Sequence, residues 1–247
     1  MTSGTGRGRT SEPDALYDDR YFDEQLHRDH WFRNNAAKRE LRWREVLRMI
    51  DPSPADRVLE IGCAAGHHAV SLAPRVAEVV GVDYAPAAID RARRRAAEAG
   101  VTNASFFCRD ARKLEVLADA SFDKVAAIDF VEHVDDDTLL GILAEVRRVL
   151  RPNGTLSIFT PCASHYVEWL KARNLVLRQI PGHVAVRDEA QCRDVLARAG
   201  FDVADLRFAP STYPGAGWFD RWLGRAPVVG PWFRFRLCIV ARPRLPR

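Results

Sequence analysis

The stretch Val58-Leu59-Glu60-Ile61-Gly62-Cys63-Ala64-Ala65-Gly66 decides the fold of this 247-residue chain. A short apolar β run ends in a turn of small residues, and a helical pattern begins directly after the turn. Glycine has no Cβ, so such a turn lets the backbone approach a ligand that larger residues would exclude. The stretch therefore predicts a strand, a ligand-binding turn and a helix in succession.

The spacing of the glycines argues against an ordinary dinucleotide site. The dinucleotide fingerprint is G-x-G-x-x-G, which brings a pyrophosphate onto a helix N-terminus. Here Gly62 and Gly66 are spaced G-x-x-x-G, and Glu60 stands two residues before the first. A carboxylate beside a phosphate site would repel the phosphate, so this turn suits a ligand with a cationic end.

Strand-like and helix-like segments alternate along most of the chain. Strands are expected at 57–61, 78–82, 105–108, 124–128, 155–160, 201–208 and 233–241, and helices at 41–50, 67–73, 86–99, 138–150, 166–180 and 188–199. This alternation predicts an α/β fold, a Rossmann-like and mostly parallel sheet with helices on both faces. We see no break in composition that would mark a second domain.

Acidic residues follow the second and third expected strands. Asp83 closes the second strand and can accept hydrogen bonds from both hydroxyls of a ribose. Asp110, followed by Ala111, comes directly after the third strand, where its carboxylate could accept a hydrogen bond from an adenine amine. Together with Glu60, these acids indicate a cleft for an adenosine-containing ligand.

The motifs as a series resemble those of class I S-adenosylmethionine-dependent methyltransferases. The matching segments are E-I-G-C-A-A-G, V-D-Y, R-D-A, F-D-K-V followed by E-H, and L-R-P-N-G-T-L. They are most similar to the subgroup of ubiquinone-type O-methyltransferases and natural-product and glycan methyltransferases, over roughly residues 58–161. The resemblance implies seven strands with the last one antiparallel, S-adenosylmethionine as cofactor and S-adenosylhomocysteine as product.

The same resemblance implies a set of cofactor contacts. Gly62, Ala64 and Gly66 would wrap the methionine part, Asp83 and the adjacent Tyr84 would lie at the ribose, Asp110 and Ala111 at the adenine, and the backbone near Ile128 at the methionine end. Ala64 departs from the family, which usually has glycine at this position. An alanine should fit there if its φ stays negative.

His133 is the candidate catalytic residue. It follows the fourth expected strand, at the sheet edge where ligands bind, and its pKa near neutrality suits removal of a proton from an acceptor hydroxyl. The alternative, that the Glu-His pair only shapes the loop, stays open. His183 and Tyr166 are weaker candidates, in a region expected to cover the acceptor pocket. Asp135 to Asp137 are expected to cap a helix. No metal site is predicted.

The positive charge of the chain is concentrated near its C-terminal end. The net charge is +4, yet residues 221–247 contain seven arginines and no acid, so the remaining residues carry −3. That distribution, and the lack of an N-P-P-Y motif, make a nucleic-acid substrate unlikely. Arginines and aromatics alternate at 218–236. We interpret this segment as a loop followed by a final strand; the alternative is a patch that contacts an anionic membrane or a lipid-linked acceptor.

Five scattered cysteines without a C-x-x-C pair favour a reducing, cytoplasmic location, with the inner membrane face as a peripheral alternative.

We expect a disordered leader at 1–16 and a single methyltransferase domain at 17–247, with lid helices at 17–51, the cofactor-binding core at 52–161 and the acceptor side at 162–247. The predicted activity is methylation of an oxygen, nitrogen or carbon of a small molecule. The rival interpretations are a non-catalytic cofactor-binding protein and an NAD(P)-dependent oxidoreductase.

Overall fold

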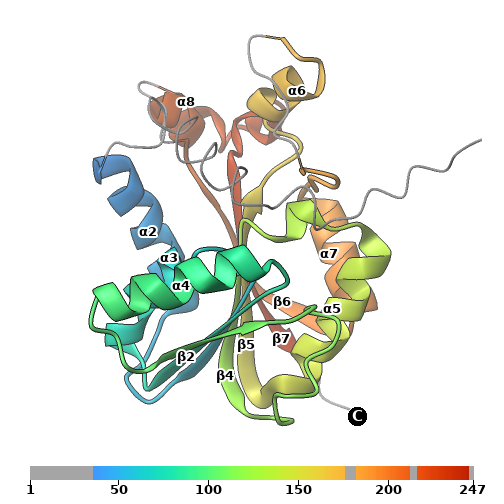
Figure 1. Cartoon of the computed structure of the whole chain (residues 1–247). Coiled ribbons are helices and arrows are strands. Elements are labelled where there is room, and N and C mark those ends of the chain that lie inside the picture. Colours follow the sequence, from blue (N-terminus) through green and yellow to red (C-terminus); the bar gives the residue numbers. More distant parts are fainter. Residues whose placement is uncertain (1–35, 176–181, 212–215, 245–247) are drawn as a thin grey trace, which may run out of the picture.

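A seven-stranded sheet with the order β3-β2-β1-β4-β5-β7-β6 forms the centre of the protein (Figure 1). The structure is a computed structural model that describes residues 36–175, 182–211 and 216–244. The strands are β1 Arg57–Ile61, β2 Glu78–Asp83, β3 Ala104–Cys108, β4 Phe122–Ile128, β5 Leu150–Pro161, β6 Phe201–Ala209 and β7 Arg236–Pro243. The expected leader, and the lid segment up to residue 35, lie outside the described residues.

The strand directions confirm the predicted fold class. Strands β1 to β5 pair in parallel with their neighbours, whereas β7 runs antiparallel between β5 and β6. Parallel strands place their carboxyl ends at one edge of the sheet. The turn after β1, the acid that closes β2 and the loop after β4 therefore meet at that edge, as the sequence predicts.

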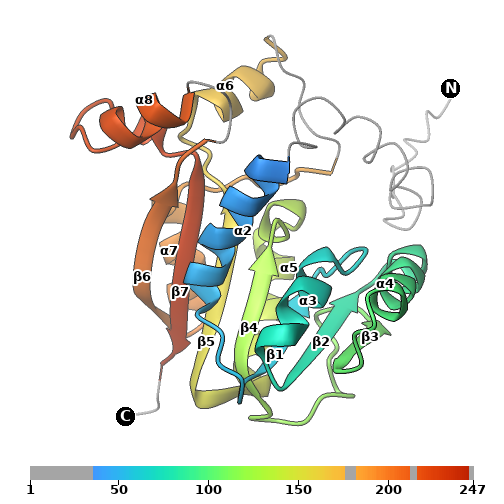
Figure 2. The same ribbon diagram turned by 90° about the vertical axis from the view of Figure 1, so that its left-hand side faces the viewer.

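Helices cover both faces of the sheet (Figure 2). The helices are α2 Ala36–Ile50, α3 His67–Leu72, α4 Pro86–Glu98, α5 Asp136–Val149, α6 Tyr166–Ala172, α7 Glu189–Arg198 and α8 Ala216–Leu223, with short 3₁₀ helices η2 Ala73–Arg75, η3 Val131–His133 and η4 Gly230–Phe233. Helices α2, α3 and α4 lie on one face, and α5 and α7 on the other. None of these helices is both long and apolar enough to cross a membrane.

Two apolar clusters hold the layers together. In β1, Val58 packs in the cluster that contains α2, α3 and α4, while the next residue, Leu59, packs in the cluster with α5 and α7. Because successive side chains of a strand point to opposite faces, a strand covered on both sides must be apolar at nearly every position. This requirement explains the continuous apolar runs from which the strands were predicted.

The structure corrects three expected boundaries. The strand expected at 155–160 begins earlier, at Leu150, because this residue pairs with Phe122 before a shift in register, so residues 152–154 lie inside β5. Proline is tolerated at such an irregularity. The last strand begins at Arg236, since η4 occupies the preceding residues, and α8 was not predicted. The helix expected at 166–180 ends at Ala172, and 176–181 lie outside the described residues.

The predicted cap before α5 is confirmed. The side chain of Asp135 accepts a hydrogen bond from the backbone N–H of Thr138 at 2.8 Å. This bond lowers the pKa of Asp135. Ionised carboxylates are favourable at a helix N-terminus, so the acidic run stabilises the start of α5.

Candidate active site

The turn between β1 and α3 has a left-handed backbone at three positions. Gly62 has a φ of 66°, Ala64 of 45° and Gly66 of 72°. A Cβ on Gly62 would lie 2.2 Å from the ring of Phe130, and one on Gly66 would lie 2.8 Å from Cβ of Ala92, so both positions require glycine. The negative φ under which Ala64 would fit without cost is not observed, and this alanine carries backbone strain.

Asp83 fastens this turn to the end of β2. Its Oδ2 accepts the N–H of Ala64 at 2.9 Å, and its Oδ1 accepts the N–H of Ala85 at 3.0 Å. Burial raises the pKa of Asp83, while the backbone N–H groups act in the opposite direction. The N–H of Ala64 thus donates a hydrogen bond to Asp83, and this bond stabilises the strained backbone of Ala64. Each carboxylate oxygen of Asp83 retains a lone pair that can accept a hydrogen bond from a ribose hydroxyl. The ribose contact of Asp83 and its neighbour Tyr84 stays a prediction.

Glu60 is a buried acid without a complete set of partners. Only 2% of the residue is exposed. Its Oε1 lies 3.4 Å from Nδ1 of His68, and its Oε2 has no hydrogen-bond partner among the described residues. Since an unsatisfied buried carboxylate is costly, this oxygen indicates a site for a cationic or hydrogen-donating group.

The sequence analysis gave no role to His68 beside Glu60, or to Trp43, which stacks on His68. His68 lies beside the carboxylate, and the centre of its ring is 5.7 Å from that of Trp43 of α2, on which it stacks. Trp43 belongs to α2, the helix that precedes β1. The only local signal was the place of His68 in the first turn of α3, directly after the glycine turn.

Asp110 lies beside an arginine at the end of β3. Nε and Nη2 of Arg112 donate to its Oδ2 at 3.0 and 2.6 Å. These hydrogen bonds hold the pKa of Asp110 below its ordinary value. The carboxylate is therefore ionised and can only accept hydrogen bonds, as contact with an adenine amine would require. That contact of Asp110 and Ala111 stays a prediction.

The end of β4 is tied to α2 and β7 through Asp129. This residue follows the buried Ile128 and has a φ of 49°, and its carboxylate pairs with Arg42 of α2 and Arg236 of β7. Both guanidinium groups lie over the ring of Phe159, at 5.2 and 5.5 Å. The sequence motifs gave these arginines no role. The backbone contact expected near Ile128 stays a prediction.

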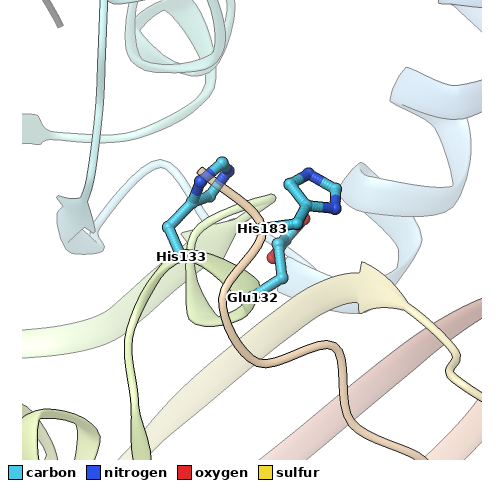
Figure 3. Close-up of side chains that lie close together, drawn as sticks. All are labelled: Glu132, His133 and His183. Atoms are coloured by element: carbon cyan, nitrogen blue, oxygen red, sulfur yellow. The ribbon is translucent and has the colours of Figure 1, made fainter. Parts of the chain in front are cut away.

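His133, Glu132 and His183 lie together beyond β4 (Figure 3). The Nδ1 atom of His133 is 3.0 Å from the carbonyl oxygen of Gly182, and its ring meets that of His183 edge-on at 4.9 Å. Burial lowers the pKa of His133, so the imidazole is neutral at pH 7 and can accept a proton. Two of the three candidate acceptor-side residues are thus brought together.

Glu132 is at least as buried as Glu60, with 1% of the residue exposed. Its Oε2 accepts a hydrogen bond from Oγ1 of Thr160 at 3.0 Å, and its Oε1 has no hydrogen-bond partner among the described residues. Burial raises the pKa of this carboxyl group. One atom each from Glu132, His133 and His183 lie within 4.8 Å of one another, and such a donor set can hold a divalent transition-metal ion. The sequence analysis did not foresee this set.

The segment that carries His183 is fixed onto η3 by its backbone. The N–H groups of Val184 and Ala185 donate to the carbonyl oxygen of Glu132 at 3.0 and 3.1 Å. Arg187, only 4% exposed, donates to the carbonyl oxygen of Val131 at 2.7 Å. The third candidate, Tyr166, lies elsewhere, because its ring packs on His165 and Phe233 at the start of α6.

Comparison with known proteins agrees with this geometry. Residues 58–154 match a family model described as a methyltransferase domain. This segment is a methyltransferase domain. It contains the β1 turn, Asp83, Asp110 and His133, whereas the segment with His183 lies beyond it.

Two curated relatives extend the similarity of the methyltransferase domain. The chain is 32% identical over 158 residues to 27-O-demethylrifamycin SV methyltransferase of Amycolatopsis mediterranei, covering 62% of this chain and 56% of that protein. It is 33% identical over 169 residues to ubiquinone biosynthesis O-methyltransferase of Azorhizobium caulinodans, covering 64% of each. The chain thus spans less than two thirds of the length of either relative.

A solved structure shows the fold over a larger share of the chain. Magnesium protoporphyrin IX methyltransferase (ChlM) from Synechocystis PCC 6803, with bound SAH, superposes with a TM-score of 0.64. The match covers 93% of this chain and 97% of that one, at 16% identity. The methyltransferase domain and the strands that follow it therefore have the fold of class I methyltransferases.

Proposed function

We propose that this protein transfers a methyl group from S-adenosylmethionine to an oxygen, nitrogen or carbon atom of a small-molecule acceptor. The observation that carries the proposal is the buried Glu60 carboxylate at the end of β1, with an oxygen that no described residue satisfies. A cationic group of the methionine part would supply the missing partner. The glycine turn gives such a ligand access to the backbone.

The residues of the site mainly bind and align the two reactants. When bound, S-adenosylmethionine supplies a methyl group that is already activated by a sulfonium. The chain then has to hold the adenosine at Asp83 and Asp110, bring the acceptor to the same sheet edge and exclude water. For a hydroxyl acceptor, the neutral imidazole of His133 is the group that removes the proton.

The binding step is tested with purified protein by calorimetric titration of S-adenosylmethionine and S-adenosylhomocysteine. We expect both to bind, and the Glu60→Gln variant to bind at least about tenfold more weakly, since a hydrogen bond to a charged group contributes roughly 1.5–3 kcal/mol. The matched control is Glu115→Gln, because Glu115 is exposed and lies outside the site. Binding of NADH in place of these ligands would instead support the oxidoreductase alternative.

The transfer step is tested with a methyl-labelled donor and a fractionated cell extract. We expect label in a fraction of small molecules or lipids, together with release of S-adenosylhomocysteine. Tight binding of the donor with no product in any fraction would support the non-catalytic alternative. This outcome is distinct from a failure to bind, so the two experiments separate the cofactor from the activity.

The class of acceptor and the location are part of the same proposal. The names of the two curated relatives, a rifamycin and a ubiquinone methyltransferase, favour a small molecule over nucleic acid. Arginines and aromatics between β6 and β7 support an acceptor that is lipid-linked or held at a membrane. Five free cysteines favour the cytoplasm, including its inner membrane face.

A further inference from the structure

Exposed apolar side chains are concentrated on one part of the protein. Eleven large apolar residues are exposed among the described residues, and eight of them lie in 166–175 and 216–233. We call these eight the tryptophan surface: Trp169, Leu175, Trp218, Phe219, Trp222, Val228, Val229 and Trp232. Trp218 and Trp222 are 65% and 67% exposed, so their indole rings are not part of the core. Exposed patches of this kind usually mark an interaction surface.

The tryptophan surface is a single platform made by three elements. Trp169 of α6 contacts Trp232 of η4 at 6.2 Å, and Trp218 stacks on Trp222 along α8 at 6.1 Å. Beneath them, the buried Nε2 of His165 lies 3.3 Å from Oδ1 of Asp220 and so joins the start of α6 to α8. These contacts hold the aromatic rings outward on a fixed support.

The charge around the tryptophan surface is positive. Arg221 and Arg225 are exposed on and after α8, and the guanidinium of Arg173 lies 4.2 Å from the centre of the Trp169 ring. The two acids of these segments, Glu168 and Asp220, are buried, and Glu168 pairs with Lys171. The described residues of this surface therefore present cations and aromatic rings without an exposed carboxylate.

We propose that the tryptophan surface binds an anionic phospholipid bilayer. Tryptophan is enriched where proteins meet the membrane interface, and arginine next to it is attracted by acidic headgroups. A protein partner and a second copy of the chain are the alternative occupants, and the experiment below distinguishes them from lipid. The charge and the type of the exposed side chains together favour a lipid surface.

The position of this surface connects it to the candidate active site. Helices α6 and α8 stand beyond the carboxyl ends of β4 and β5, the edge at which His133 lies (Figures 1 and 2). A protein bound through α6 and α8 turns this edge toward the bilayer. Delivery of a membrane-held acceptor to the site rests on the proposed methyl transfer, whereas lipid binding itself does not.

The binding is measured by flotation of the full-length protein with two kinds of vesicle, one of phosphatidylcholine and one of equal parts phosphatidylcholine and phosphatidylglycerol. We expect binding to the anionic vesicles that weakens with salt, and a blue shift of tryptophan fluorescence. The Trp218→Ser/Trp222→Ser and Arg221→Glu/Arg225→Glu variants should each lose at least about tenfold in partition.

Matched controls remove the same number of apolar or cationic groups elsewhere on the surface. Leu41→Ser/Val116→Ser and Arg44→Glu/Arg94→Glu change exposed residues away from α6 and α8 and should bind as the unchanged protein does. Thermal unfolding of every variant establishes that it folds, and binding of S-adenosylhomocysteine reports separately on the proposed function.

Three results would overturn the proposal. The first is no flotation with anionic vesicles. The second is flotation that the control substitutions reduce as much as those at α8. The third is self-association of the protein, seen by light scattering and abolished by Trp218→Ser/Trp222→Ser, with no lipid binding. That result would assign the surface to a second copy of the chain.

Discussion

Ala64 is strained because it stands in the turn at a φ of 45°, where an L-residue costs about 1–2 kcal/mol. Replacing it with glycine removes this cost but loses roughly 0.5–1 kcal/mol to the greater entropy of the unfolded chain. We therefore predict that Ala64→Gly raises the free energy of unfolding by roughly 0.5–1 kcal/mol in urea titrations. Ala65→Gly is the control and should destabilise, because Ala65 does not have a positive φ.

The buried imidazole of His133 predicts a dependence of stability on pH. Burial lowers its pKa in the folded protein, so below its unfolded pKa of about 6.5 the unfolded chain binds more protons than the folded one. Stability should therefore fall as the pH drops from about 6.5 toward the lowered pKa. The neutral His133→Asn variant, whose amide can still donate to Gly182, lacks this contribution.

The measurement for His133 is the melting temperature of both proteins from pH 8 to pH 5. We expect the difference in melting temperature between the two proteins to be constant above the unfolded pKa of histidine. As the pH falls below it, the melting temperature of His133→Asn should rise relative to that of the unchanged protein. Parallel curves over the whole range would mean that His133 titrates as an ordinary exposed histidine and is not held neutral by burial.

The residues that the sequence revealed are those whose role depends on local order. Glu60, Asp83 and Asp110 were found because each follows or ends an expected strand, and parallel strands bring such positions together. Arg42, Trp43 and Arg236 were not found, since they reach the site from α2 and β7 through contacts across the fold. The positive φ of Ala64 was missed because alanine gives no signal for a left-handed backbone.

At the scale of elements, the segment between β5 and α7 depends on one buried arginine. Arg187 donates to the carbonyl oxygens of Val131, Val134 and Ala185 at 2.7–3.1 Å and pairs with Asp136. Arg187→Met should lower the free energy of unfolding by roughly 3 kcal/mol, because it leaves buried carbonyl groups without a donor. Arg187→Lys should restore little of it, since an ammonium cannot reach all of these acceptors.

The control for Arg187 is Arg198→Met on α7. Arg198 approaches the same Asp136 at 4.0 Å, but it is 48% exposed, and exposed pairs of this kind contribute about 0–1 kcal/mol. Equal losses in the two variants, measured by urea unfolding, would contradict the role that we give to the buried guanidinium.

The sequence predicted the βα units well and the later elements less well. Each strand from β1 to β4 is a short apolar run followed by a clear turn or helix signal, so its boundaries were close to the observed ones. The start of β5 depends on pairing with Phe122 across a register shift, which no local pattern encodes. Helix α8 was missed because it has only eight residues and lies in a link rich in proline and glycine, although Trp218 and Trp222 have the i, i+4 spacing of a helix.

At the scale of the whole molecule, the fold limits the chemistry without deciding it. The parallel strands β1, β2 and β4 place Glu60, Asp83 and His133 at one edge of the sheet, where we propose that S-adenosylmethionine binds. The same architecture can serve many reactions. We therefore expect the residues around His133 and His183, together with α6 and α8, to determine which acceptor binds. These are the parts that the sequence motifs predicted least.

We propose, in addition, that the described residues unfold as one unit. The apolar cluster on the α5 face joins Leu59 and Val125 to Leu196 of α7 and Ile239 of β7, so the expected cofactor core and the acceptor side share buried surface. Scanning calorimetry should then show a single transition, and S-adenosylhomocysteine at about 100 times its dissociation constant should stabilise it by about 2.7 kcal/mol. For a chain of this size, that corresponds to a rise in melting temperature of roughly 5–10 °C. Because ligand held by Glu60 stabilises everything that unfolds with it, the entire heat-absorption peak should move. With about tenfold weaker binding, Glu60→Gln should retain roughly half of the shift at the same ligand concentration. Two peaks, of which only one responds to the ligand, would show that residues 162–247 unfold separately from the cofactor core.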